Sequence, residues 1–441
     1  MCSPAGLPEV MRPGAHIRAA VEVLEEVLTR YRPAAIALAD WGKSHRFAGS
    51  SDRAAIGNLV YDALRCRRSL AQRMDSDTPR ALVLAAAAQA LGLPEAAVIA
   101  SADGSAYALE PLSEAERAAI GRSLPAQATA GIRGDIPDWL EPSFVRAFGA
   151  AAATEGAALA RRAPVDLRVN TLKADREKVL KALARFAAEA TGYSPLGVRL
   201  AARDGPHRQA NVEAEVGHAR GWYEVQDEGS QLAGLLAHAG PRQQVLDICA
   251  GAGGKTLAFA AAMRNTGQVY AYDEDAQRLR PIIERLKRAG VRNAQVLPAG
   301  DHAALSALGA RFDLVFIDAP CTGSGAWRRR PDAKWRLRPA NLEQRRVEQR
   351  ALLSTAALHV KPGGRLVYVT CSVLPEENDD QIVWLLSNHT GFAPLKWREA
   401  WARGVGGNAP QSAGDRDDAL LLTPARHGTD GFFIASLLRT D

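Results

Sequence analysis

Cysteine is scarce in this 441-residue chain, which contains five, at positions 2, 66, 249, 321 and 371. Their number is odd, they are widely spaced, and no CxxC pair or cysteine–histidine ligand spacing occurs. This pattern argues against a disulfide framework and against a zinc site. We therefore expect no metal, and a reducing compartment, the cytoplasm.

Long apolar runs are also missing. The longest small-apolar run, 81–93, is too short to span a bilayer, and residues 1–16 contain no apolar stretch of signal-peptide length. We therefore expect no membrane partner. The net charge is only +6, but much of the positive charge is arginine, which suits contacts with phosphates and base edges. Charge alone does not decide whether the partner is a nucleic acid.

Three regions that differ in composition and hydrophobic pattern follow one another along the chain. Residues 1–150 are rich in alanine, leucine and arginine, with apolar residues at helical spacing, as at Ile17, Val21, Leu24 and Leu28, so we expect an all-α domain. Residues 151–235 combine a strand-like 165–172, a predicted helix over 175–190 and glycine turns, which indicates a small α+β domain. In residues 236–441 strands and helices alternate, which predicts parallel strands in an α/β doubly wound, Rossmann-like domain.

A glycine-rich loop directly follows the first strand of this third region. The strand 245–249 leads into Gly251, Gly253 and Gly254, and a helix starts near Lys255. Glycines let the backbone approach a ligand, and the helix N-terminus offers free N–H groups. A tight structural turn would use the same glycines. Asp273, at the end of the next strand, has the spacing of an acidic residue that binds ribose hydroxyls, which favours the cofactor interpretation.

The spacing of the glycines and the lysine in this loop indicates the type of cofactor. It has neither the GxxxxGK[ST] spacing of a P-loop nor a clean GxGxxG, so a smaller adenosine-containing ligand is favoured, and S-adenosylmethionine fits. Asp301, after the strand-like 294–300, is a candidate partner for the adenine amino group. A loop aspartate or helix N-cap explains Asp301 equally well.

Two cysteines each follow an apolar, β-branched run. Cys321 follows DLVFIDAP and Cys371 follows RLVYVT, so both are expected where a strand ends at a cleft. A single buried cysteine is more often inert, but two at the strand ends of a cofactor-binding sheet favour catalysis. Methylation of carbon 5 of a pyrimidine requires such a thiol, because a thiolate added to carbon 6 makes carbon 5 nucleophilic. Asp318 could then bind the N3 and N4 edge of the base, although a turn or capping role also explains it.

The runs CAGAGGKT, DAPCTGSG and VTCSVLPEEN, with VDLRVNTLK, YEVQDEGSQLA and WRRRPDAKW, resemble the signature series of the Sun/RsmB family of S-adenosylmethionine-dependent RNA cytosine-5 methyltransferases. The likeness extends in order from about residue 165 to the C-terminal TDGFFIASLL. The N-terminal region, with DRAAIGNLVYDALR, is similar to the antitermination-factor-like RNA-binding domain of the bacterial ribosomal RNA members. The resemblance thus implies RNA as the partner, with 16S ribosomal RNA favoured and transfer RNA as the alternative.

The resemblance also implies roles for individual residues. Cys371 would be the nucleophile, Cys321 would assist product release, and Lys255 would lie close to Asp318 at the reacting centre. The implied cofactor-binding residues are Cys249, Ala250, Gly251, Ala252, Gly253, Gly254, Lys255, Asp273, Asp301 and Asp318. One departure is Ala252, where the family commonly has proline, and this bears on cofactor affinity because alanine leaves the loop less rigid.

Basic residues near two tryptophans suggest where RNA binds. Segment 327–338 could clamp phosphates while a ring stacks on a displaced base, although a solvated basic loop has the same composition. The target cytosine must be unpaired or flipped out to be reached. The candidate RNA-binding residues are Arg168, Lys173, Arg328, Arg329, Arg330 and Lys334.

Two other functions compete with this one. A methyltransferase acting on DNA, small molecules or protein nitrogen is less favoured, since the chain has DAPC where amino-methylating enzymes carry [DNS]PP[YFW], and it lacks the ENV motif of DNA cytosine enzymes. A non-catalytic RNA-binding or ribosome-assembly factor would not need Lys255, Asp318, Cys321 and Cys371. The sequence does not fix the oligomeric state, and we expect a monomer.

Overall fold

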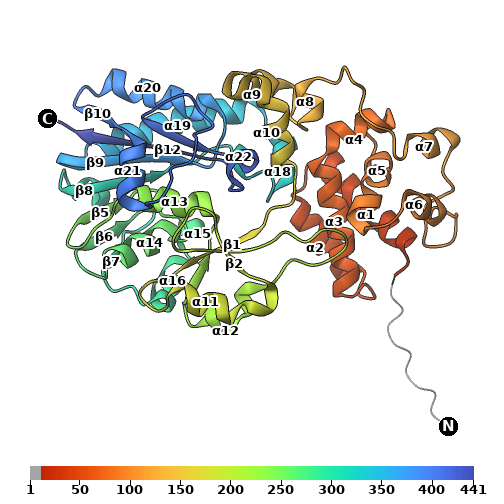
Figure 1. The fold of residues 1–441 in the computed structure, drawn as a ribbon, viewed down its shortest axis with the longest axis horizontal. Helices are drawn as coiled ribbons and strands as arrows, with labels where there is room; N and C mark the ends of the chain where they lie inside the picture. The colour runs from red at the N-terminus through yellow and green to blue at the C-terminus, as the bar shows by residue number, and fades with distance from the viewer. Residues whose placement is uncertain (1–10) are drawn as a thin grey trace, which may run out of the picture.

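The computed structural model describes residues 11–441. Cys2 and most of the N-terminal segment considered for a signal peptide lie outside the described residues. Figure 1 shows an N-terminal helical part at one end of the molecule and a sheet-containing part at the other. Within residues 11–441, no helix is both long and apolar enough to cross a membrane.

The N-terminal helices form their own apolar core. Ile17, Leu24, Ile56 and Leu59 are buried in it, and Val21 and Leu28 pack against it, so the helical periodicity predicted from the sequence is confirmed. The helices are α1 (Pro13–Thr29), α2 (Ala34–Ser44), α3 (Ser50–Arg65), α4 (Arg67–Met74), α5 (Pro79–Leu91), α6 (Glu95–Ser101) and α7 (Glu114–Ala119). Three further helices follow, α8 (Ala130–Arg133), α9 (Glu141–Phe148) and α10 (Ala152–Leu159). Phe144 of α9 and Leu159 of α10 belong to the core of the large sheet instead.

A small antiparallel sheet comes next, in the order β2-β3-β1-β4. Its strands are β1 (Val165–Val169), β2 (Glu189–Ala190), β3 (Gly197–Leu200) and β4 (Tyr223–Val225), and its helices are α11 (Arg176–Ala182) and α12 (Val216–Ala219). The helix predicted over 175–190 is therefore wrong in its second half. Ala187 has a positive φ of 53°, which breaks the helix, and residues 189–190 pair with β3 instead.

The large sheet has the order β10-β12-β9-β8-β5-β6-β7, and β11 pairs with β12. Its strands are β5 (Gln244–Asp247), β6 (Gln268–Ala271), β7 (Ala294–Val296), β8 (Phe312–Asp318), β9 (Val360–Thr370), β10 (Phe392–Leu395), β11 (Ala419–Leu422) and β12 (Phe432–Arg439). The five strands β5 to β9 are parallel, as predicted. The final strand differs, because β12 runs antiparallel to β9, β10 and β11. Only the short α22 (Pro424–His427) separates β11 from β12, too little chain for a parallel crossover.

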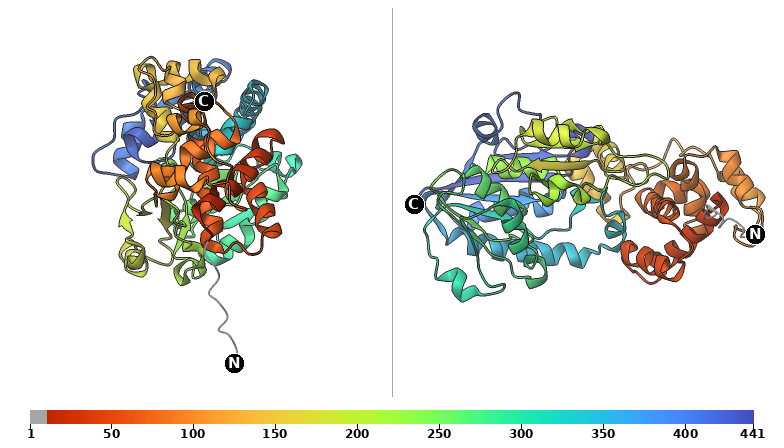
Figure 2. Two further views of the ribbon diagram at one scale, coloured as in Figure 1. Left: turned by 90° about the vertical axis from the view of Figure 1, so that its right-hand side faces the viewer. Right: turned by 90° about the horizontal axis from the view of Figure 1, so that it is seen from below.

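Helices cover both faces of this sheet (Figure 2), as a doubly wound fold requires. One face packs against α9, α10, α19 (Pro339–Ala357) and α20 (Asp379–Asn388), and the other against α13 (Glu228–Leu236), α14 (Gly254–Ala262) and α21 (Trp397–Gly404). The remaining helices are α15 (Ala276–Leu279), α16 (Ile282–Ala289), α17 (His302–Ser306) and α18 (Pro331–Arg336). Strand order reverses between β5 and β8, and the crevice at the carboxyl ends of such strands is where open α/β sheets bind ligands.

Candidate active site at the carboxyl ends of β5, β8 and β9

The glycine loop between β5 and α14 has the backbone that its sequence predicts. Gly251 and Gly253 have positive φ angles of 49° and 85°, and a Cβ on Gly253 would lie 2.6 Å from Ile282 Cγ1, so a side chain does not fit there. The Gly251 N–H donates a hydrogen bond of 2.9 Å to Asp273 Oδ2. Asp273 thus lies against the loop at the end of β6, where the sequence places it.

Asp301 caps a helix. Its Oδ1 accepts a hydrogen bond of 2.9 Å from the backbone N–H of Ala304 in the first turn of α17. This is the N-cap role that the sequence leaves open, and it uses one of the two carboxylate oxygens.

Asp247 is a site residue that the sequence analysis does not single out. It ends β5, is fully buried, and accepts a hydrogen bond of 2.7 Å at Oδ2 from Thr256 Oγ1, while its Oδ1 has no protein partner. Burial raises the pKa of this carboxyl from 3.8 to about 7. The available signal was a carboxylate at the end of a buried strand, immediately before a glycine loop.

Lys255 and Asp318 form an ion pair across the crevice. Lys255 Nζ, on α14, donates hydrogen bonds of 2.8 Å to Asp318 Oδ2, at the end of β8, and to Ser230 Oγ of α13. The lysine side chain is only 4% exposed, whereas that of Asp318 is 32% exposed. The carboxylate therefore faces a space that a ligand can reach, and the buried ammonium group holds it there.

The two predicted thiols lie side by side. Cys321 follows β8 and Cys371 follows β9, and their Sγ atoms are 3.4 Å apart. The hydrogen bond with Cys371, together with burial, raises the pKa of Cys321 well above its ordinary value. Cys321 therefore keeps its proton, and either thiol can donate in the contact between the two sulfurs.

The other described cysteines also have raised pKa values. Burial raises the pKa of Cys249, on the glycine loop, well above the ordinary value and that of Cys66, in the helical part, to about 12. Neither thiol ionises readily, so nucleophilic chemistry is left to the 321–371 pair.

A buried pair of side chains holds the Cys321 loop on both sides. Glu377 accepts hydrogen bonds from the backbone N–H of Thr322 at 2.8 Å and from the Thr322 hydroxyl, while Gln349 donates from Nε2 to the carbonyl of Pro320 at 3.0 Å and to Glu377 Oε1 at 3.2 Å. Glu377 lies six residues after Cys371 in the chain. It therefore connects the two cysteine loops.

Removing this carboxylate is expected to loosen the Cys321 loop. Glu377→Ala leaves two partly buried donors of Thr322 and a buried Gln349 donor without this acceptor, so we expect the free energy of unfolding to fall by about 2–4 kcal/mol, measured by urea denaturation. Glu377→Gln, which keeps an acceptor oxygen, should lose less than half of that. An equal loss of unfolding free energy in both variants would show that hydrogen bonds to residue 377 do not hold the Cys321 loop.

Most of the candidate RNA-binding residues have partners within the chain. Arg168 is buried and donates from Nε to Gln226 Oε1, and Lys173 Nζ donates to the carbonyl of Arg288 at 2.7 Å. Arg328 and Arg329 both pair with Asp227 and Asp430.

The rest of the basic segment divides between interior and surface. Lys334 is buried, and its Nζ donates to the carbonyl of Arg65 at 2.9 Å, whereas Arg330 is exposed. The ring of Trp327 is buried and stacked on Phe144, with centroids 5.7 Å apart. In this conformation Arg168, Arg328 and Lys334 stabilise the fold, and Trp327 presents no free face to a base.

The part of the chain that the structure describes contains no candidate metal site. No group of three or more histidine, cysteine or acidic side chains is arranged there to hold an ion.

Comparison with known proteins identifies the family. Residues 235–438 match the model for 16S rRNA methyltransferase RsmB/F, and residues 136–204 match the RsmF/B-like ferredoxin-like domain. A probable ribosomal RNA small subunit methyltransferase B from Synechocystis sp. is 34% identical over 68% of this chain and 66% of its own length. The ribosomal RNA small subunit methyltransferase B of Sodalis glossinidius is 34% identical over 72% of this chain and 70% of its own length.

A solved structure extends the likeness to almost the whole fold. The crystal structure of PH0851 superposes with a TM-score of 0.70 at 25% identity, covering 97% of this chain and 99% of that one. The matches to the sequence models, to the curated relatives and to this fold agree, and the chain belongs to the RsmB/F methyltransferase family.

Proposed function

We propose that this protein transfers a methyl group from S-adenosylmethionine to carbon 5 of a cytosine in RNA, through a covalent bond between Cys371 and carbon 6 of the base. The observation that carries the proposal is the pair of thiols 3.4 Å apart at adjacent strand ends, beside the ion pair that the buried Lys255 makes with Asp318. A methyl acceptor that is already nucleophilic, such as an amine, would need neither thiol.

The residues around the glycine loop fit the cofactor. The loop backbone comes close to the crevice, and the unpartnered Oδ1 of the buried Asp247 can accept a hydrogen bond from a cationic or N–H group of a ligand. Asp273 and Asp301 lie at the ends of the next two strands and can bind the adenosine portion. When bound, S-adenosylmethionine supplies an electrophilic methyl group on a sulfonium ion.

The protein's own residues would act in a defined order. Cys371 Sγ forms a bond to carbon 6, and the electron pair displaced from the carbon 5–carbon 6 double bond makes carbon 5 nucleophilic. Asp318, held by Lys255, binds the N3 and N4 edge of the base and stabilises that adduct. After methylation the carbon 5 proton passes to a base, a stage that Cys321 assists from its position beside Cys371. The electron pair of that C–H bond re-forms the carbon 5–carbon 6 double bond, and Cys371 leaves carbon 6 as a thiolate.

The relatives' names favour ribosomal RNA of the small subunit as the acceptor. We propose the same substrate class for this chain, with residues 1–150 as a helical RNA-binding domain, 151–235 as a small α+β RNA-binding domain and 236–441 as the catalytic domain. The expectation of a monomer stays a prediction.

Methylation of defined RNAs tests the proposal. Purified protein is incubated with labelled S-adenosylmethionine and either unmodified 16S ribosomal RNA or unmodified transfer RNA, and the digested nucleosides are identified by mass spectrometry. We expect label in 5-methylcytidine from 16S RNA. Label in transfer RNA alone would identify transfer RNA as the substrate instead. Label in a different nucleoside, or in none, would contradict the proposed reaction.

A further inference from the structure

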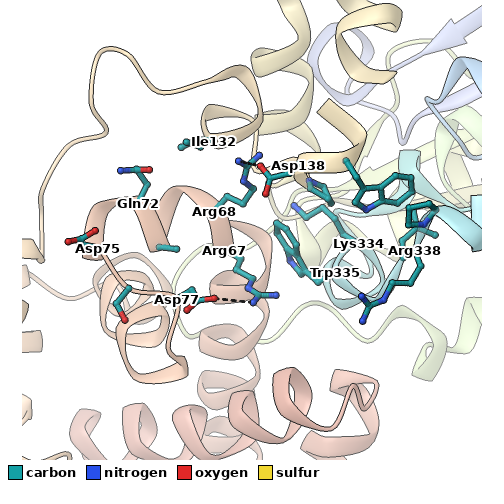
Figure 3. Close-up of a pocket in the computed structure, with 16 residues that line it drawn as sticks. Arg67, Arg68, Gln72, Asp75, Asp77, Ile132, Asp138, Lys334, Trp335 and Arg338 are labelled. Atoms are coloured by element: carbon teal, nitrogen blue, oxygen red, sulfur yellow. Dashed lines mark ion pairs between the residues drawn. The ribbon is translucent and has the colours of Figure 1, made fainter. Parts of the chain in front are cut away.

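A cavity of about 710 Å³ lies at the seam between the helical part and α18 (Figure 3). One wall comes from α4 and the loop after it, with Arg67, Arg68, Gln72, Asp75 and Asp77. The opposite wall comes from residues 334–339. The volume is in the range of small-ligand sites and large enough for a nucleotide.

The aromatic wall of this cavity is fixed in place. Trp335 Nε1 donates a hydrogen bond of 2.5 Å to the carbonyl of Leu64, at the end of α3, and the neighbouring Lys334 Nζ donates to Arg65 O. The Arg67 guanidinium lies over the Trp335 ring, 5.5 Å from its centroid, and Lys334 Nζ lies over the same ring at 4.8 Å. A base that stacks on this indole would take the place of the Arg67 guanidinium, which would then be free to bind the adjoining phosphate.

Two cations of the cavity, Arg67 and Arg338, are only loosely engaged, whereas Arg68 also donates to the carbonyl of Ile136 at 2.7 Å and Lys334 is buried. Arg67 meets Asp77 at 3.6 Å, and that carboxylate is 75% exposed, while Arg68 pairs with Asp138, which is 85% exposed. Within the described residues, Arg338 has no carboxylate within salt-bridge distance. Exposed ion pairs of this kind contribute about 0–1 kcal/mol, so a phosphate can displace the carboxylates at low cost.

The lining also contains acceptors, which a site for phosphate alone would not need. Asp75, Asp77 and Asp138 place negative charge beside the arginines, and Gln72 offers an amide. Base edges carry N–H donors as well as acceptors, so a lining of arginine, carboxylate, amide and tryptophan matches a whole nucleotide, with its phosphate on the arginines and its base on Trp335.

The cavity is connected to the thiol pair through the chain. Nine residues separate Cys321 from the start of α18 at Pro331, and within that stretch Gly325 N–H donates to the carbonyl of Cys371 at 3.0 Å. Arg65 Nη2 in turn donates to the carbonyl of Arg328 at 2.9 Å. RNA held at the seam would therefore be bound by a wall whose position is tied to that of the two thiols.

We propose that the seam cavity binds an unpaired nucleotide of the RNA substrate outside the catalytic centre, with Trp335 stacking on the base and Arg67 and Arg338 binding phosphates. This inference rests on the proposed function for the identity of the RNA. It adds Arg67 to the RNA-binding candidates, and within the basic segment 327–338 it selects Trp335 and Arg338 for this role.

Binding of fluorescein-labelled decauridine tests the site. The double variant Arg67→Ala/Arg338→Ala is compared with wild type and with a matched control, Arg264→Ala/Arg292→Ala, whose arginines are exposed at the β6–β7 edge of the large sheet. We expect the seam variant to raise the Kd at least about tenfold and to reduce the slope of log Kd against log salt by about 1.4, as for two lost phosphate contacts. The Kd of the control variant for decauridine should rise by less than about threefold.

Two further results separate the alternatives. Unchanged decauridine affinity in the seam variant, or competition by inorganic polyphosphate as strong as that by decauridine, would overturn the nucleotide site. Methylation of 16S RNA by the seam variant should show a raised KM and an unchanged kcat. If no variant or wild type methylates RNA while the affinities still differ as expected, the proposed function fails and the seam site stands.

Discussion

Replacing Cys371 with alanine is expected to lower the rate of methyl transfer to RNA by at least about 10³-fold, because the neighbouring Cys321, whose pKa is raised by burial and by its hydrogen bond with Cys371, is a poor replacement nucleophile. Cys249 and Cys66 are poor substitutes, since burial keeps both protonated. The measurement is single-turnover transfer of labelled methyl groups with enzyme in excess. A residual rate within tenfold of wild type would contradict the role of Cys371.

Replacing Cys321 with alanine should block a later stage of the reaction than replacing Cys371. The first methyl transfer is expected to proceed within about tenfold of the wild-type rate, while multiple turnover falls by at least about 10²-fold because the product is not released. A comparison of burst amplitude with steady-state rate separates the two stages. If Cys321→Ala abolished the burst and Cys371→Ala did not, the roles of the two thiols would be reversed.

Replacing Asp247 with asparagine is expected to stabilise the protein at alkaline pH and to weaken cofactor binding. The buried carboxyl has a pKa of about 7 in the folded chain against 3.8 unfolded, so the native state binds a proton that the unfolded state does not. This contribution to stability therefore falls as pH rises from about 4 to about 7, and the loss is complete above that. Between pH 5 and pH 8 wild type should lose about 2–3 kcal/mol through this group, and the variant none.

Urea unfolding at both pH values measures that difference. Asp301→Asn is the matched control, since asparagine caps α17 as well as aspartate does. Titration calorimetry at pH 8 should show S-adenosylmethionine binding at least about tenfold more weakly to Asp247→Asn, because at that pH the wild-type carboxylate is ionised and the variant has lost its anionic acceptor. A stability difference from wild type that does not change with pH would contradict the buried, protonated state of Asp247.

Local signals were enough to predict the elements that carry the site. The apolar run before Gly251 predicted β5, the β-branched runs before Cys321 and Cys371 predicted β8 and β9, and alternation with helices predicted their parallel arrangement. Parallel strands bring their carboxyl ends to one edge, so residues 50 positions apart could be expected near each other without any contact being known.

The basic segment after Cys321 illustrates what local signals cannot supply. Arginine and lysine are seldom buried, so WRRRPDAKW indicates an exposed surface. The structure buries Arg328 against Asp227 and Asp430 and buries Lys334 against the end of α3, partners that lie about 100 to 270 positions away in the chain. Asp247 was missed for a related reason, since its significance comes from an oxygen without a partner, which only three-dimensional contacts reveal.

Mass spectrometry can identify the residue that becomes bonded to RNA. Protein carrying Cys321→Ala is incubated with S-adenosylmethionine and unmodified 16S ribosomal RNA, denatured and digested with nuclease and protease, and the nucleotide-bearing peptide is sequenced by mass spectrometry. We predict a 5-methylcytidine nucleotide attached to Cys371, and no adduct when Cys371→Ala is added to the same variant. An adduct at another residue, or methylated RNA released without any adduct, would contradict covalent catalysis by Cys371.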